Sequence, residues 1–144
     1  MGSVAQRLNV LGTPLQICAT RPITGFLRNG YCDSVSSDYG KHYLAAEVTD
    51  EFLDFSAKQG NDLRGGISQP DGSVAELGGG CKWCLCVTRW KEAFLNKDKF
   101  GDKIVPRVIL EATHKDTLEK SDVTLDMLKQ FEFKNTEPVG RQEL

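Results

Sequence analysis

The stretch Cys81-Lys-Trp-Cys-Leu-Cys-Val-Thr-Arg-Trp90 gathers three cysteines, both tryptophans of the chain and an arginine. Its apolar, β-forming part predicts a strand over 83–87, and Thr88 is a good N-cap for a helix that follows. Because side chains alternate along a strand, Cys84 and Cys86 are expected on one face, with Cα atoms about 6.6 Å apart. The stretch therefore predicts a strand-to-helix junction that carries two neighbouring thiols.

Short elements of both kinds are predicted on either side of this junction. The expected strands cover 42–48, 83–87 and 104–110, and the expected helices follow the N-caps Thr49, Thr88 and Thr124. Six glycines between 61 and 80 predict a long loop. The pattern indicates an α+β fold with a small mixed β-sheet, about three helices and long Gly-rich loops. We expect a single domain over 1–144, with a polar tail over 134–144.

Charge and hydropathy exclude several classes of protein. The 18 Lys and Arg residues nearly balance 20 Asp and Glu residues, so the net charge of −2 disfavours nucleic-acid binding. We see neither an apolar run long enough for a membrane span nor the pattern of a signal peptide. We therefore expect a cytoplasmic protein with no membrane partner. An odd count of five cysteines then predicts reduced thiols rather than a disulfide framework.

The glycine-rich motifs do not predict a cofactor. Gly78-Gly79-Gly80 lacks the Gly-Lys-Ser/Thr ending of a phosphate-binding loop, and no dinucleotide-binding fingerprint joins a strand to a helix. We accordingly expect no nucleotide or other cofactor.

Cysteine, histidine and acidic residues suggest one possible chemistry. A nucleophilic thiol needs a neighbouring base, and the base needs a third group that orients it. Candidate thiols are Cys32, Cys84 and Cys86, candidate bases are His42 and His114, and candidate orienting acids are Asp38 and Asp62. The preferred catalytic set is Cys84, Cys86, His42 and Asp38.

Two arginines and two neighbouring polar residues suggest a binding site. Arg28 and Arg89 have the guanidinium geometry that suits a carboxylate or phosphate, and we group Asn61 and Asp62 with them as substrate-binding candidates. Each also has a structural alternative. The arginines can form surface ion pairs, and Asn61 and Asp62 can bond local backbone after the helix.

The cysteines also permit a metal site or plain core packing. Cys81 would add a third thiolate to Cys84 and Cys86, and Cys18, Cys32, His42 or His114 would complete a tetrahedron for zinc. Free cysteine is nevertheless among the most buried residue types, so core packing explains the same pattern. We assign no residue as a metal ligand.

Several motifs in order resemble the family called domain of unknown function 2237. They are Pro22-Ile-Thr24-Gly25-Phe26-Leu-Arg28-Asn-Gly30-Tyr-Cys32, Asp38-Tyr-Gly40-Lys-His42, Thr49-Asp-Glu-Phe52-Leu53, Gly60-Asn61-Asp62-Leu63, Trp83-Cys84-Leu-Cys86-Val-Thr-Arg89-Trp90-Lys-Glu92-Ala93 and Val108-Ile-Leu110-Glu-Ala112-Thr113-His114. The resemblance covers about 9–131. It implies no activity, and in the family pattern position 81 is usually polar and position 45 is usually Cys.

Three functions from different classes remain open, and the sequence does not decide whether the protein is an enzyme. The first is a domain that binds an anionic metabolite at a polar Arg/His/Asp/Cys site. The second is a cysteine-dependent enzyme with His42 or His114 as base. The third is a structural zinc domain. A small-molecule ligand is the partner we expect, and the sequence makes no prediction about oligomeric state.

Overall fold

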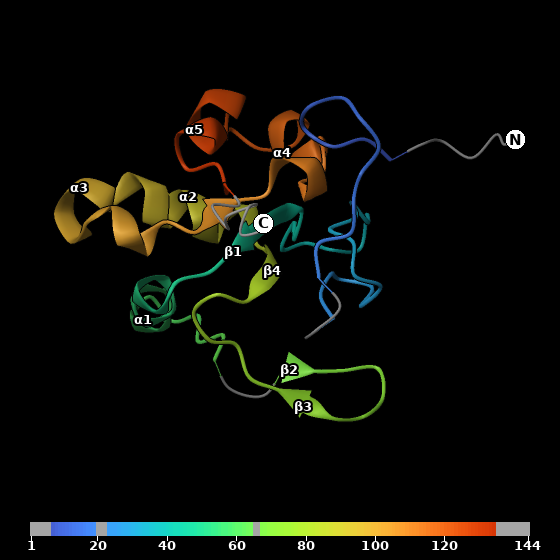
Figure 1. Ribbon diagram of the computed structural model, residues 1–144, viewed down its shortest axis with the longest axis horizontal. Helices are drawn as coiled ribbons and strands as arrows, with labels where there is room; N and C mark the ends of the chain where they lie inside the picture. The colour runs from blue at the N-terminus through green and yellow to red at the C-terminus, as the bar shows by residue number, and fades with distance from the viewer. Residues whose placement is uncertain (1–6, 20–22, 65–66, 135–144) are drawn as a thin grey trace, which may run out of the picture.

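A computed structural model of the chain describes residues 7–19, 23–64 and 67–134 (Figure 1). A three-stranded antiparallel sheet lies at its centre, in the order β4 (Lys82–Leu85), β1 (Leu44–Glu47) and β5 (Arg107–Val108). A separate antiparallel hairpin consists of β2 (Ile67–Ser68) and β3 (Val74–Ala75). One parallel bridge joins Val108 to Glu132. The predicted α+β class is confirmed.

Five helices and two 3₁₀ turns accompany the strands in the described part of the chain. Three of them correspond to the predicted helices: α1 (Asp50–Lys58), α2 (Val87–Leu95) and α5 (Leu125–Gln130). The others are one-turn helices, α3 (Lys97–Phe100) and α4 (Asp116–Glu119), and the 3₁₀ turns η1 (Asp102–Ile104) and η2 (Leu110–Ala112). Two predicted N-caps are confirmed, since Thr49 Oγ1 accepts the N–H of Phe52 and Thr124 Oγ1 accepts that of Met127.

Two predicted elements have different boundaries. The strand at the central junction ends at Leu85, so Cys86 rather than Thr88 occupies the N-cap position of α2. The strand expected over 104–110 has only two residues, because a 3₁₀ turn flanks it on each side. Pro106 has no N–H for a ladder. Its carbonyl instead accepts the indole N–H of Trp90.

The central sheet separates two clusters of buried side chains. Leu44 and Leu85 contribute to the larger cluster with residues of α1 and α2, as the period of two predicts. Ala45 and Cys84 belong to the smaller cluster, which also contains Cys18, Cys32 and Ala112. In Figure 1 helices α1 and α2 lie on one side of the sheet, and the N-terminal segment runs along the other.

The N-terminal segment is fixed by a buried asparagine. The Asn9 side chain donates to Thr13 Oγ1 and to the carbonyl of Glu111, at 2.8 and 3.0 Å. Its Oδ1 accepts the backbone N–H groups of Leu11 and Thr13. Asn9 is 1% exposed, so these bonds replace water that the group cannot reach.

Two further expectations concern the ends of the chain and the membrane. The predicted polar tail over 134–144 lies outside the described residues, apart from Lys134. Within the described parts of the chain, no helix combines the length and apolarity needed to cross a bilayer.

Candidate functional site

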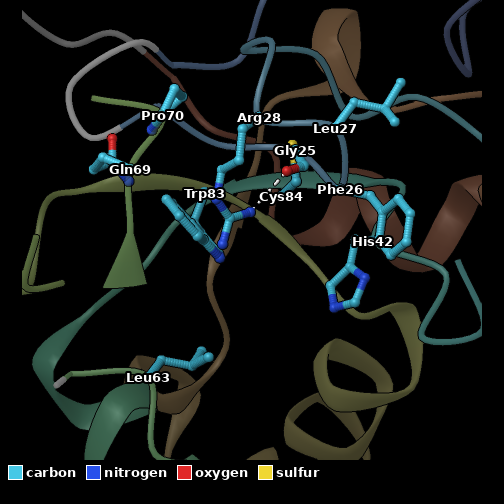
Figure 2. Close-up of a pocket in the computed structure, with 10 residues that line it drawn as sticks. All are labelled: Gly25, Phe26, Leu27, Arg28, His42, Leu63, Gln69, Pro70, Trp83 and Cys84. Atoms are coloured by element: carbon cyan, nitrogen blue, oxygen red, sulfur yellow. Dashed lines mark hydrogen bonds between the residues drawn. The ribbon is translucent and has the colours of Figure 1, made fainter. Parts of the chain in front are cut away.

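A cleft of about 670 Å³ lies beside β4, at the meeting point of the N-terminal segment and the β2–β3 hairpin (Figure 2). Phe26, Leu63 and Trp83 give it apolar walls, while Arg28 and His42 supply polar groups. Its volume falls within the range that is usual for small-molecule sites.

The motif Asp38-Tyr-Gly40-Lys-His42 holds the imidazole at the wall of this cleft. Asp38 Oδ2 accepts the backbone N–H of His42 at 2.9 Å, and Asp38 Oδ1 lies 2.7 Å from His42 Nδ1. An ionised carboxylate can only accept, so Nδ1 donates to it, and in the neutral form of the ring Nε2 is then an acceptor. A Cβ at Gly40 would lie 2.5 Å from His42 Cε1, so only glycine leaves room for this ring position.

Arg28 brings a positive charge to the same cleft. Its Nη1 donates to the carbonyl of Gly25 at 2.7 Å, and its guanidinium carbon lies 5.1 Å from the centroid of the Trp83 ring. Among the described residues other than glycine, positive φ occurs at Arg28 and Lys41, both at 54°. Such a conformation costs about 1 kcal/mol and is often found at functional sites.

A smaller hollow of about 60 Å³ adjoins the cleft, since His42, Leu63, Trp83 and Cys84 line both. Cys86 and Arg89 complete the smaller hollow with other residues. The structure therefore places seven of the eight predicted site residues as follows. The cleft is lined by Arg28, His42 and Cys84. The hollow is lined by His42, Asn61, Cys84, Cys86 and Arg89. Asp38 contacts His42 from behind the wall of the cleft.

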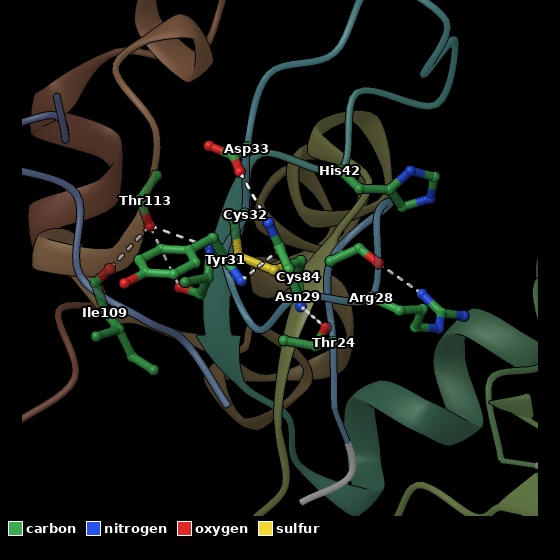
Figure 3. Close-up of a disulfide and its surroundings, with 12 residues drawn as sticks. Thr24, Arg28, Asn29, Tyr31, Cys32, Asp33, His42, Cys84, Ile109 and Thr113 are labelled. Carbon is green, nitrogen blue, oxygen red and sulfur yellow. Dashed lines mark hydrogen bonds between the residues drawn. A yellow bond between two sulfur atoms is a disulfide. The ribbon is translucent and has the colours of Figure 1, made fainter. Parts of the chain in front are cut away.

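Cys84 is not a free thiol in this structure, because its sulfur is bonded to that of Cys32 (Figure 3). The prediction of five reduced thiols is therefore wrong for this pair. Cys84 is 1% exposed, and its backbone N–H donates to Thr24 Oγ1 at 2.8 Å. The two cysteines are 52 residues apart in the chain, so nothing local in the sequence pairs them.

Cys86 is a half-buried free thiol that lies beyond the end of β4. It occupies the N-cap position of α2 in an extended conformation, and it lines the smaller hollow together with Cys84. Its Sγ lies 3.1 Å from Thr88 Oγ1. The zinc set that the sequence permits, with Cys81, Cys84 and Cys86, is not assembled in the described part of the chain, where the one close group of three ligand-type residues is Cys18, Cys32 and Cys84.

The region that builds this site matches a known family. A family model described as "Uncharacterized protein conserved in bacteria (DUF2237)" matches residues 8–132. The chain belongs to the DUF2237 family. A search of curated proteins finds no match. The match includes every residue that lines the cleft, but DUF2237 membership assigns none of them an activity.

Three predicted binding residues of this DUF2237 protein have structural partners. Arg89 Nη1 lies 3.3 Å from both the Gln59 carbonyl and Glu92 Oε1, so it ties the end of α1 to α2. Asn61 Nδ2 donates to Ser56 Oγ, and Asp62 is an exposed acceptor for the N–H of Arg64. Asp62 lines neither cavity, which leaves Arg28 as the predicted binding residue of the larger cleft.

His114 occupies a different environment. Its Nδ1 accepts the backbone N–H of Asp116 at 3.0 Å, and the ring packs 6.1 Å from that of Tyr43. Burial lowers the pKa of His114, although Asp116 and Asp33 oppose this effect. His114 is not among the residues that line the cleft or the hollow. The structure favours His42 over His114 for any role in these cavities.

Sequence reasoning missed the aromatic walls of the DUF2237 cleft. Trp83 was expected only as a strand residue, and Phe26 only as part of a family motif, yet both face the cavity (Figure 2). Phe26 is 41% exposed and its ring stacks on that of His42, with centroids 6.4 Å apart. The position of this phenylalanine, directly after Gly25 and two residues before Arg28, was the signal available in the sequence.

Proposed function

We propose that the cleft binds a small anionic molecule. Arg28 supplies the positive charge, His42 Nε2 accepts a hydrogen bond from a hydroxyl or similar donor of the ligand, and the aromatic walls contact its apolar part. A small hydroxy acid or a phosphate monoester has these features together.

The position of Arg28 is the observation that carries this proposal. Its side chain is held against Trp83 and bonded to the Gly25 carbonyl, so less conformational entropy is lost when an anion binds. His42 is fixed in the same cleft by both oxygens of a buried carboxylate. A site whose charged and polar groups are already oriented is typical of small-molecule binding.

The test is a thermal-shift screen with small carboxylates and phosphate monoesters, followed by calorimetric titration of the best ligand. Arg28→Gln removes the charge and is expected to weaken binding by about 10 to 100-fold, the usual value of a charge-assisted hydrogen bond. Arg107→Gln is the matched control. Its guanidinium lies 5.2 Å from the Phe131 ring centroid, a similar stacking arrangement, and it does not line the cleft.

The control separates a local from a general charge effect. If Arg28→Gln and Arg107→Gln lose the same affinity, binding depends on the overall charge of the protein, and the proposed site is contradicted. Unchanged affinity in Arg28→Gln would contradict it as well.

A cysteine-dependent enzyme is the second candidate, favoured by the hollow that Cys86 and His42 share. Cys86 would be the nucleophile, His42 the base and Asp38 the group that orients the base. Iodoacetamide labelling followed by mass spectrometry is expected to modify Cys86 at least about tenfold faster than Cys81, which is also half-buried. His42→Ala should slow Cys86 alone. Similar rates for both cysteines would refute this function.

A further inference from the structure

A third sulfur lies beside the disulfide. The sulfur atoms of Cys18, Cys32 and Cys84 all lie within 4.8 Å of one another, and Cys18 is free. All three residues are buried, with exposed fractions of 8%, 0% and 1%. The disulfide therefore has a thiol next to it inside the protein.

Burial determines which thiol can react with this disulfide. Exchange begins when a thiolate attacks a disulfide sulfur, so the attacking group must reach that sulfur. Thiols in solution are kept away by the packing around Cys32 and Cys84. Cys18 is already inside this packing and needs no opening of the fold.

We propose that Cys18, Cys32 and Cys84 form a three-sulfur exchange centre that can release Cys84 as a thiol. The Cys18 thiolate attacks Cys32 Sγ, a Cys18–Cys32 bond forms, and the Cys32–Cys84 bond breaks. The electron pair of the broken bond leaves on Cys84 Sγ, which takes up the proton that Cys18 lost. One disulfide replaces another, so the step requires no oxidant or reductant.

The released thiol would belong to the cleft. Cys84 lines both the cleft and the smaller hollow, and His42 lines both as well. Exchange therefore determines whether these cavities contain a disulfide or a thiol beside an oriented imidazole. This consequence for ligands rests on the function proposed above, whereas the exchange itself does not.

The rate should depend strongly on pH. Burial raises the pKa of the Cys18 thiol to about 12, and the positive charge of Lys82 opposes this increase. The thiolate is then a fraction of about 10⁻⁵ at pH 7 and increases about tenfold with each pH unit. Exchange is expected to be slow at neutral pH and readily measurable near pH 9.

Peptide mapping without reduction tests the proposal directly. Cys18, Cys32 and Cys84 fall on three different tryptic peptides, so each disulfide between two of these three gives a distinct mass. Fragment ions distinguish Cys84 from Cys86, because both lie on the peptide 83–89. After incubation at pH 9 and quenching with iodoacetamide in denaturant, which exposes the buried thiols, we expect wild type to show a Cys18–Cys32 link and alkylated Cys84. The amount formed in a fixed early interval should be about tenfold higher at pH 9 than at pH 8.

Two variants provide the controls. Cys18→Ala should retain the Cys32–Cys84 link and leave Cys84 unlabelled at either pH. Cys32→Ser, refolded from denaturant in the presence of oxidised glutathione, should form a Cys18–Cys84 link, which tests the proximity of these sulfurs even if exchange in wild type is slow. Circular dichroism establishes that both variants are folded.

The proposal fails if neither wild type nor Cys32→Ser forms a link that contains Cys18. It also fails if Cys84 is labelled to the same extent in Cys18→Ala as in wild type. The ligand site is tested separately, because Cys18 does not line the cleft and Cys18→Ala should bind the anion found in the screen as wild type does. Lost anion binding with intact exchange would refute only the proposed function.

Discussion

Reduction of the Cys32–Cys84 disulfide should destabilise the protein strongly. A cross-link between residues 52 apart lowers the conformational entropy of the unfolded chain by about 14 cal/mol/K. This corresponds to about 4 kcal/mol of stability at 25 °C. The free energy of unfolding of a small domain is about 5 to 15 kcal/mol, so this loss is a large part of the total stability. With a slope of about 2 kcal/mol per M in urea, the midpoint of unfolding should fall by about 2 M.

The assay is urea denaturation followed by tryptophan fluorescence, since Trp83 and Trp90 are 5% and 0% exposed. Cys18→Ala is the suitable background, because it fixes the disulfide at one pair of sulfurs. The same protein is compared before and after treatment with a phosphine reductant. A thiol assay in denaturant checks the starting state, where wild type should have three free thiols and gain two on reduction. A stability change below about 1 kcal/mol would refute the reasoning.

Three other perturbations test particular contacts. Gly40→Ala should displace the His42 ring and change its ¹⁵N tautomer signals, while Gly78→Ala, which meets no atom within 4 Å, should not. Asn9→Ala leaves buried backbone groups without partners. It should therefore lower the free energy of unfolding by about 3 kcal/mol and the melting temperature in calorimetry by about 10 °C. Because burial lowers the pKa of His114 below 6.5, the unfolded chain gains its proton first on acidification. Stability should therefore fall as the pH drops below 6.5, and His114→Asn should lose this part of the pH dependence in urea titrations at several pH values.

Local signals predicted the helices well. Thr49 and Thr124 cap α1 and α5 because the capping oxygen and the N–H that it accepts lie three residues apart. The prediction of a strand over 104–110 was mostly wrong, because the pairing of this segment depends on β1, which is far away in the sequence. There, tertiary contacts with Trp90 and two 3₁₀ turns override an apolar pattern that suits a longer strand.

The same distinction applies to the site. Asp38 and His42 were predicted together and do interact, because a turn of four residues brings them into contact. The link between Cys32 and Cys84 could not be predicted, since spacing alone gives no pairing for distant cysteines. The approach of Arg28 to Trp83 across more than fifty residues is likewise a product of the fold.

The most direct test of the anion site is NMR titration with the anion found in the screen. The chain has two histidines, so the ring signals of His42 and His114 can be followed together, along with the Arg28 Nε–H signal. We predict that the signals of His42 and Arg28 shift on binding with the affinity measured by calorimetry, while those of His114 do not. Saturable binding that leaves His42 and Arg28 unperturbed would contradict the account.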